Sequence, residues 1–114
     1  MASLGACDTS LGEFEQLILL ALFRLSDNAY GATIHHEVQK RTRRPISISA
    51  VYTTLDRLAE KGMVDSRIGE PTPRRGGRRK KFFSLRPEGA QALSQSYRVF
   101  REMTRGLERQ LEKL

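Results

Sequence analysis

The residues best suited to chemistry in this chain are basic and lie close together. Residues 67–81 carry seven Lys or Arg side chains and one acidic side chain, whereas residues 1–66 carry seven basic and eight acidic ones. The excess is concentrated around Arg74, Arg75, Arg78, Arg79, Lys80 and Lys81. Positive groups packed this closely repel one another unless a negative partner is present. The segment therefore predicts contact with a polyanion.

No set of residues in the sequence fits catalysis or metal binding. His35 and His36 are adjacent, so on a helix they point about 100° apart, and no second histidine follows at HExxH spacing. A nucleophile elbow, a phosphate-binding Gly-Lys-Ser/Thr loop and acids at catalytic spacing are all missing. Cys7, the single cysteine, cannot form an internal disulfide. We therefore expect no enzyme, no cofactor and no metal.

Size and composition favour one small globular domain outside the membrane. The chain has 114 residues, 39% of them hydrophobic, and a net charge of +7, which leaves no room for a second catalytic domain. The longest apolar run, residues 17–23, is far shorter than the roughly 20 residues that a membrane span needs. No secretory signal precedes it. The cytoplasm is the expected location.

Two helices are expected in the first part of the chain, after a flexible arm over residues 1–9. Ser10 and Glu13 form a capping box that starts the first helix, which ends near Ser26. Its apolar stripe contains Phe14, Leu17, Ile18, Ala21 and Leu25. Tyr30, Ile34 and Val38 repeat on a second helix that reaches about Arg43. The basic end of this second helix either complements the helix dipole or contacts phosphates.

A third helix combines a buried stripe with a polar outer face. Ser47 or Ser49 caps it, and Gly62 stops it in a left-handed conformation. Val51, Leu55 and Leu58 form the inner stripe. The outer face holds mostly short or polar side chains, namely Ser49, Thr53, Arg57 and Glu60, with Ala50 and Tyr52 on its flanks. Short side chains on this face would let another molecule approach closely.

The remaining sequence predicts a hairpin and one long helix. Residues 63–68 and 80–85 are typical of short strands, joined by a Gly- and Pro-rich tip that holds the arginines. Pro87 and Glu88 start a helix that could run to Leu114 and extend about 42 Å. A heptad seam follows it: Leu93, Tyr97, Phe100, Thr104, Leu107, Leu111 and Leu114. We expect this seam to pair with a second chain, assisted by Phe14 and Leu17; the alternative is a helix folded back on its own core.

Together these elements predict a mainly α fold of the winged helix-turn-helix type. A three-helix core and a two-stranded wing would occupy residues 10–86, and the dimerisation helix residues 87–114. A major groove about 12 Å wide admits one helix, which the third helix would supply. The minor groove is narrow and strongly negative, so an arginine-rich hairpin can enter it. The predicted partner is double-stranded DNA.

The chain also resembles the PadR family of transcriptional regulators. The resemblance runs through the segments LGEFEQLILLAL, AYGATIHHEV, ISISAVYTTLDRLAEKGMV, GEPTPRRGGRRKKFFSL and RPEGAQAL, in this order. It implies a sequence-specific DNA-binding homodimer, usually a repressor, on a near-palindromic operator. Small hydrophobic or aromatic effectors are common in this family and would bind between the helices of the dimer. Arg86 departs from the threonine usual in the family, and this should weaken the cap of the last helix.

The resemblance places six residues of the third-helix region at or near DNA: Ser47, Ser49, Ala50, Tyr52, Thr53 and Arg57. Arg74, Arg75, Arg78, Arg79 and Lys80 would act from the wing. For Tyr52 the alternative is a partly buried ring that closes the core, and for Arg57 a solvated surface position. A competing hypothesis is an RNA- or ribosome-associated module. The strand aromatics argue against it, because Phe82 and Phe83 alternate and only one of them would be exposed for base stacking.

Overall fold

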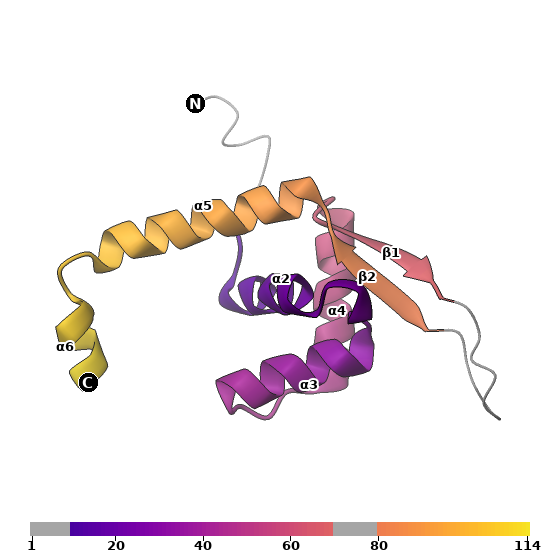
Figure 1. Ribbon diagram of the computed structural model, residues 1–114, viewed down its shortest axis with the longest axis horizontal. Helices are drawn as coiled ribbons and strands as arrows, with labels where there is room; N and C mark the ends of the chain where they lie inside the picture. The colour runs from indigo at the N-terminus through magenta and orange to yellow at the C-terminus, as the bar shows by residue number, and fades with distance from the viewer. Residues whose placement is uncertain (1–9, 70–79) are drawn as a thin grey trace.

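The order of elements matches a winged helix-turn-helix with an added C-terminal arm. The computed structural model describes residues 10–69 and 80–114 (Figure 1). Its elements in order are α2 (Glu13–Leu25), the 3-10 helix η1 (Ser26–Asn28), α3 (Gly31–Thr42), α4 (Ile48–Glu60), β1 (Val64–Ile68), β2 (Lys81–Leu85), α5 (Pro87–Thr104) and α6 (Glu108–Lys113). The predicted fold class, mainly helical with a two-stranded antiparallel sheet, is confirmed. The expected arm over residues 1–9 lies outside the described residues.

The core lies where α2, α3 and α4 meet. Its fully buried side chains are Ile18, Leu19, Ile34, Val51, Leu55 and Leu58. The expected stripe of α2 is only partly right, because Leu19 and Leu22 are buried as well, whereas Phe14, Leu17 and Leu25 are half-buried. The reason is that α2 packs against α3 and α4 and also against α5. Its buried arc is therefore wider than one amphipathic stripe.

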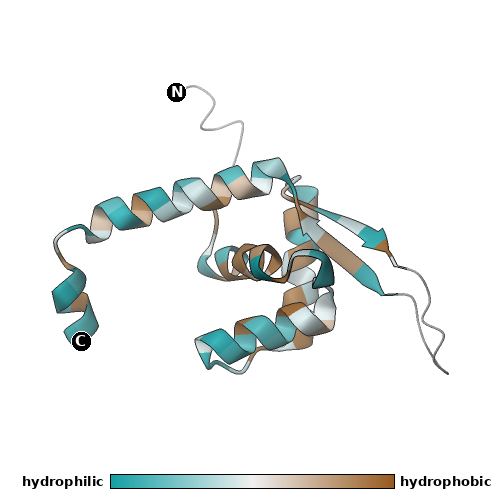
Figure 2. Ribbon diagram, viewed as in Figure 1, coloured by the Kyte–Doolittle hydropathy of each residue, from teal (hydrophilic) through white to brown (hydrophobic). Residues whose placement is uncertain are grey.

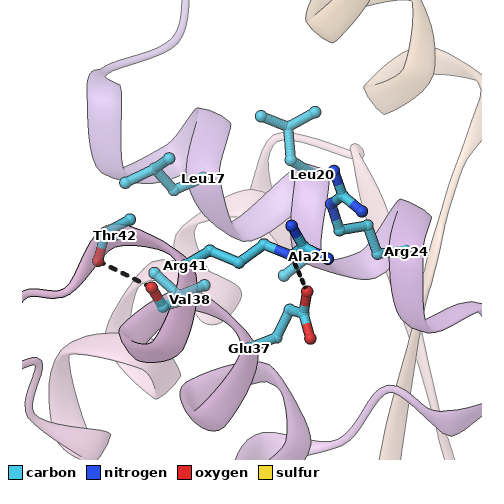
Figure 3. Close-up of a pocket in the computed structure, with 8 residues that line it drawn as sticks. All are labelled: Leu17, Leu20, Ala21, Arg24, Glu37, Val38, Arg41 and Thr42. Atoms are coloured by element: carbon cyan, nitrogen blue, oxygen red, sulfur yellow. Dashed lines mark hydrogen bonds and ion pairs between the residues drawn. The ribbon is translucent and has the colours of Figure 1, made fainter.

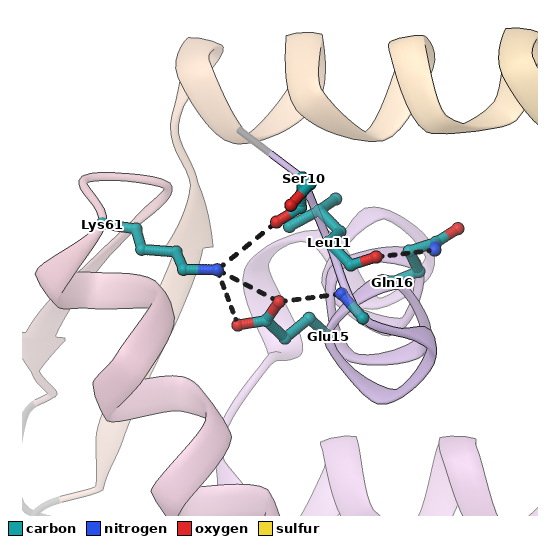
Figure 4. Close-up of polar contacts among 6 residues, drawn as sticks. Ser10, Leu11, Glu15, Gln16 and Lys61 are labelled. Atoms are coloured by element: carbon teal, nitrogen blue, oxygen red, sulfur yellow. Dashed lines mark hydrogen bonds and ion pairs between the residues drawn. The ribbon is translucent and has the colours of Figure 1, made fainter. Parts of the chain in front are cut away.

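The start of α2 differs from the expected capping box. The helix begins at Glu13, and the backbone amide of Gly12 donates to Oε1 of Glu15 at 3.0 Å. The same carboxylate accepts from Nζ of Lys61 at 3.1 and 3.2 Å, and Nζ also contacts the carbonyl of Ser10 at 3.5 Å (Figure 4). Glu15 replaces Glu13 as the capping acid because Lys61, at the end of α4, holds its carboxylate in place.

The ends of α3 and α4 are closed by local interactions. Thr33 Oγ1 accepts from the amide of Tyr30 at 3.0 Å and donates to the carbonyl of Asn28 at 2.6 Å. Arg43 ends α3 in the left-handed region at φ 56°. The predicted boundaries of α4 are confirmed, since Ser47 Oγ accepts from the amide of Ala50 at 3.1 Å and Gly62 has φ +77°.

Strands β1 and β2 pair antiparallel from Val64 opposite Leu85 to Ile68 opposite Lys81. Phe83 is buried, and its amide donates to the carbonyl of Ala29 at 2.8 Å, which fixes the hairpin to the start of α3. Arg86 caps α5 without a side-chain hydrogen bond, as its departure from threonine suggested. Its guanidinium instead binds Asp65 on β1 at 3.0 Å. These contacts keep the wing and α5 in a fixed relation to the core.

The prediction of a single 28-residue C-terminal helix is wrong. Helix α5 ends at Thr104, and α6 starts at Glu108 after a turn. Gly106 adopts φ +85°, a conformation that interrupts a right-handed helix, and the amide of Leu107 donates to the carbonyl of Thr104 at 2.8 Å. Leu93, expected in the seam, is buried in the core of its own chain. Figure 1 shows α6 at the far end of α5, apart from the helical core.

Candidate nucleic-acid interface

Helix α4 presents a largely polar surface because most of its apolar side chains turn inward, although Ile48 and Tyr52 remain 45% and 44% exposed. Val51, Thr54, Leu55 and Leu58 are buried. The residues expected on the outer face, Ser49, Thr53, Arg57 and Glu60, are all exposed, and Ala50 on the flank is half-buried. The outward positions in the first half of the helix, Ser49 and Thr53, carry side chains no longer than threonine. A groove wall could therefore approach the backbone of α4 there, while Arg57 reaches further out.

The start of α4 combines two hydroxyl groups with the positive end of the helix dipole. Ser47 Oγ lies 3.3 Å from Ser49 Oγ and accepts from the amide of Ala50. Both serines are exposed. Hydroxyl groups and first-turn amides at a helix start suit phosphate oxygens as hydrogen-bond partners.

Tyr52 joins α4 to the start of α3. A side chain at Gly31 would collide with the hydroxyl and ring of Tyr52, so the two helices approach closely only because Gly31 has none. Tyr52 nevertheless keeps 44% of its surface exposed. The two expectations for this residue are thus compatible: its ring packs against α3, and the exposed part remains free to contact another molecule.

The basic end of α3 is largely paired within the chain. Lys40 and Arg41 form ion pairs with Glu37, and the hydrogen bond from Arg41 is the main reason why the pKa of Glu37 lies below its usual value. Arg44 binds Glu13 of α2 at 3.2 and 3.3 Å. These pairs weaken the alternative in which this cluster serves phosphates.

The turn between α3 and α4 is held by two side chains of α3. His35 Nε2 hydrogen-bonds to the carbonyl of Ile46, and Gln39 Oε1 accepts from the amide of Ile46 at 3.0 Å. His35 therefore has a structural partner, in agreement with the interpretation that it is not a metal ligand. Among the described residues, no group of three or more His, Cys, Asp or Glu could hold a metal ion.

At the base of the wing, cations stack on aromatic rings. Lys80 Nζ lies 4.5 Å from the ring centre of Tyr30, and the Arg67 guanidinium lies 4.8 Å from that of Phe82. Tyr30 and Phe82 meet edge to face at 5.4 Å. Lys80 is thus held beside the N-cap of α3. The other expected wing residues, Arg74, Arg75, Arg78 and Arg79, lie outside the described residues.

The start of α3 brings the two halves of the candidate site together. Tyr30, its N-cap, contacts the wing base, and the next residue, Gly31, contacts Tyr52 of α4. Tyr30 and Arg67 were not among the expected site residues. The strand register could have indicated that Arg67 belongs to the site. Arg67 lies directly opposite Phe82, and cross-strand partners share a face of the sheet.

The strand aromatics offer no free platform for bases. Only one of the two was expected to be exposed; Phe83 is buried, and Phe82 is half-buried between Tyr30 and Arg67. Proteins that bind single-stranded RNA stack its bases on exposed aromatic rings. This arrangement weakens the RNA alternative.

A second surface, between α2 and α5, is apolar and open. A cavity of about 270 Å³ there is lined by Leu20 and Phe23 of α2 and by Tyr97 and Phe100 of α5. Phe23 and Phe100 are 64% and 68% exposed. Of the expected dimerisation residues, Tyr97, Phe100, Leu107, Leu111 and Leu114 are exposed, whereas Phe14 and Leu17 are half-buried. Figure 2 shows hydrophobic segments recurring along α5 and α6 outside the core.

No helix among residues 10–69 and 80–114 combines the length and the apolar character needed to cross a membrane.

Comparison with known proteins identifies relatives of this arrangement. Residues 19–95 match the model of the transcriptional regulator PadR-like family. A PadR family transcription regulator from Clostridium difficile is 26% identical, with a TM-score of 0.69 over 88% of this chain and 99% of that chain. A search of curated proteins found no match.

Two more distant structures share the fold. A PadR-like transcription factor from Bacteroides fragilis is 22% identical, with a TM-score of 0.70 over 84% of this chain and 87% of that chain. A PadR-like transcriptional regulator from Bacillus cereus is 14% identical, with a TM-score of 0.69 over 97% of both chains.

Proposed function

Because this chain belongs to the PadR-like family of transcriptional regulators, we propose that it is a repressor that binds a near-palindromic operator as a homodimer. Family membership makes it a DNA-binding regulator of transcription and not an enzyme. The repressor role, the operator symmetry and the dimer are our proposals.

One observation carries the assignment of the DNA-binding surface. The polar, short-chained face of α4 and the cationic base of the wing both adjoin the start of α3. In this arrangement α4 enters the major groove, and the wing follows the phosphates or enters the adjacent minor groove. The apolar stripe of α4 stays in the core, and Ile48 and Tyr52 are the large apolar side chains of this helix that remain exposed.

Each residue of this surface has a proposed role that follows from its chemistry. Ser47 and Ser49 would bind phosphates or base edges at the helix start, and Ala50 and Thr53 would allow close approach of the groove. Tyr52 would donate its hydroxyl to a phosphate, and Arg57 would reach the backbone or a guanine. Lys80, with Arg74, Arg75, Arg78 and Arg79 of the wing, would neutralise phosphates.

The dimer would place two such surfaces on one side of a DNA duplex. The exposed aromatic side chains between α2 and α5 support it, because an isolated subunit would leave Phe23, Tyr97 and Phe100 in contact with water. Two recognition helices related by two-fold symmetry would contact half-sites about 34 Å apart. We therefore expect an operator whose half-sites lie one helical turn apart.

The salt dependence of DNA binding tests this proposal. If the dimer neutralises about 6 to 10 phosphates, log K should fall with log salt with a slope of roughly −5 to −9. Replacing Arg74, Arg75, Arg78 and Arg79 by alanine should weaken binding to all sequences and flatten that slope. A control replaces Arg98 and Arg109, which are exposed and lie outside the proposed DNA-binding surface, and should leave the slope nearly unchanged. An unchanged slope in the wing variant would exclude the wing from DNA binding.

If Arg57 contacts a guanine, Arg57→Ala should instead weaken the free energy of DNA binding by about 1 to 3 kcal/mol. The loss should depend on the base at one operator position only. Operator fragments selected from genomic DNA would provide the sequence for this measurement. Competition by duplex RNA as strong as that by duplex DNA would instead favour the RNA-binding alternative.

A further inference from the structure

A second groove, between α2 and α3, lies next to the proposed dimer surface. Leu17, Leu20, Ala21 and Val38 provide its apolar lining, Arg24 and Arg41 stand at its rim, and its volume is about 180 Å³ (Figure 3). Leu20 also lines the groove between α2 and α5. The two grooves therefore adjoin at Leu20 of α2.

The rim of this groove has an excess of positive charge. Glu37 is its only acidic lining residue, and Lys40 and Arg41 already form ion pairs with that carboxylate. Arg24, from the facing helix, also lowers the pKa of Glu37, after the larger effects of Arg41 and Lys40. An occupant with an apolar stripe and acidic side chains beside it would complement this groove.

Helix α6 has this combination and lies apart from its own core. No residue of α6 is buried. Leu107, Leu111 and Leu114 are exposed and recur at spacings of four and three, which places them on one side of the helix. Glu108 and Glu112 are one turn apart on an adjacent side. The turn before α6 is well defined, since the amide of Gly106 donates to Glu108 Oε1 at 3.0 Å.

We propose that α6 of one subunit occupies the α2–α3 groove of its partner, with Leu111 against Leu20 and Glu112 beside Arg24. This inference rests on the proposed dimer and specifies its outer contact. Helix α2 runs antiparallel to α5 (Figure 1), and residues of both helices, among them Phe23 and Phe100, line the groove between them. A partner α5 packed antiparallel to α5 would therefore end near Phe23 and Arg24, and its α6 would start beside the groove.

Cysteine cross-linking between different subunits tests this placement. In a Cys7→Ser background, one tagged chain carries Leu111→Cys and an untagged chain carries Leu20→Cys. After mixing and mild oxidation, the tagged–untagged disulfide should form at least about tenfold faster than in a control pair that combines Leu111→Cys with Glu60→Cys on α4. Light scattering of the Cys7→Ser parent measures the dimer separately.

Each outcome of this experiment is decisive. A stable dimer whose Leu111–Leu20 pair reacts no faster than the control would overturn the placement of α6 and leave the proposed dimer intact. The placement would also be wrong if the disulfide formed only when both cysteines are in the same chain, because α6 would then occupy its own groove. A monomeric parent would refute the dimer itself.

A charge swap tests the proposed ion pair independently. Glu112→Lys and Arg24→Glu should each weaken dimerisation by about two- to fivefold, the size expected for an exposed pair. The double variant should recover most of that loss, whereas Glu60→Lys, the same charge change on α4, should leave the dimer constant unchanged. Additive losses in the double variant would contradict the pairing of Glu112 with Arg24.

Discussion

At the scale of single residues, Glu15 and Gly31 each connect parts of the chain that are distant in sequence. The Glu15 carboxylate accepts from the Gly12 amide at the start of α2 and from Lys61 at the end of α4. Gly31 lets α4 approach α3 because it leaves room for Tyr52. Each residue therefore matters because of a neighbour from another helix, and a substitution at each position tests its contribution.

Glu15→Ala should lower the free energy of unfolding by about 2 to 3 kcal/mol. The change removes the cap of α2 and leaves the mostly buried Lys61 ammonium without its carboxylate partner. Urea denaturation at fixed protein concentration measures the effect. Glu13→Ala is the matched control, because its ion pair with Arg44 is exposed and should contribute less than about 1 kcal/mol. Equal losses in the two variants would contradict the importance of the Glu15–Lys61 pair.

Gly31→Ala should destabilise the fold by about 1 to 3 kcal/mol, because the new methyl group would collide with Tyr52. It should also weaken DNA binding, since Tyr52 would have to move. In a Tyr52→Ala background the same change should be nearly neutral, because the obstructing ring is gone. Urea denaturation of the four proteins gives the coupling energy. A cost that is independent of Tyr52 would show that the two residues do not limit each other.

At the scale of elements, the turn between α5 and α6 decides where the C-terminal residues point. The seam residues Leu107, Leu111 and Leu114 would continue the line of Tyr97 and Phe100 only on a straight helix. Gly106 breaks that line at φ +85°. Helix α6 is thereby directed away from the axis of α5, as Figure 1 shows.

Gly106→Ala should straighten this arm. A left-handed conformation costs an alanine about 1 to 2 kcal/mol, and α6 has no buried residue to hold the turn against that strain. Spin labels at Gln95→Cys and Lys113→Cys, in a Cys7→Ser background, should move apart toward about 27 Å, the length of 18 helical residues. Gln110→Ala is the control and should leave the distance distribution unchanged. An unaltered distribution in Gly106→Ala would show that other contacts hold the turn.

At the scale of the whole molecule, the largest excess of basic residues and the large exposed apolar side chains fall in different segments of the chain. Basic residues gather in the segment 67–81, which includes the wing, whereas the large exposed apolar side chains gather on α2, α5 and α6. This separation would allow the proposed DNA contact and the proposed dimer contact to use different parts of the chain. DNA affinity should then depend on the apolar surface, because two linked subunits bind an operator more tightly than one.

Phe100→Asp should convert the proposed dimer to a monomer, because it places a charge in the apolar lining of the groove between α2 and α5. Operator affinity should fall at least about tenfold, while the circular dichroism spectrum stays that of a folded protein. Light scattering and operator titration measure the two effects. Gln91→Asp adds the same charge at another exposed position of α5 and should retain the dimer. A dimeric Phe100→Asp variant would place the interface elsewhere.

Local rules of sequence were sufficient for much of this protein. The caps of α4 at Ser47 and Gly62, the start of α5 at Pro87 and the outer face of α4 follow from residues within one helical turn of each other. The hairpin follows from two short β-prone runs around a Gly- and Pro-rich segment. These features depend on backbone preferences and side-chain periodicity, which the amino-acid order alone expresses.

Tertiary contacts decided the rest. Lys61, 46 residues away, selects Glu15 over Glu13 as the acid that caps α2, and packing on α2 buries Leu93 in its own core. The break at Gly106 differs from these, because local hydrogen bonds of Gly106 and Leu107 hold it. The sequence left it open, since a helix tolerates a glycine at a cost of only about 1 kcal/mol. The alternative local structures differ in free energy by amounts that a single long-range contact can reverse. The amino-acid order alone therefore could not decide between them.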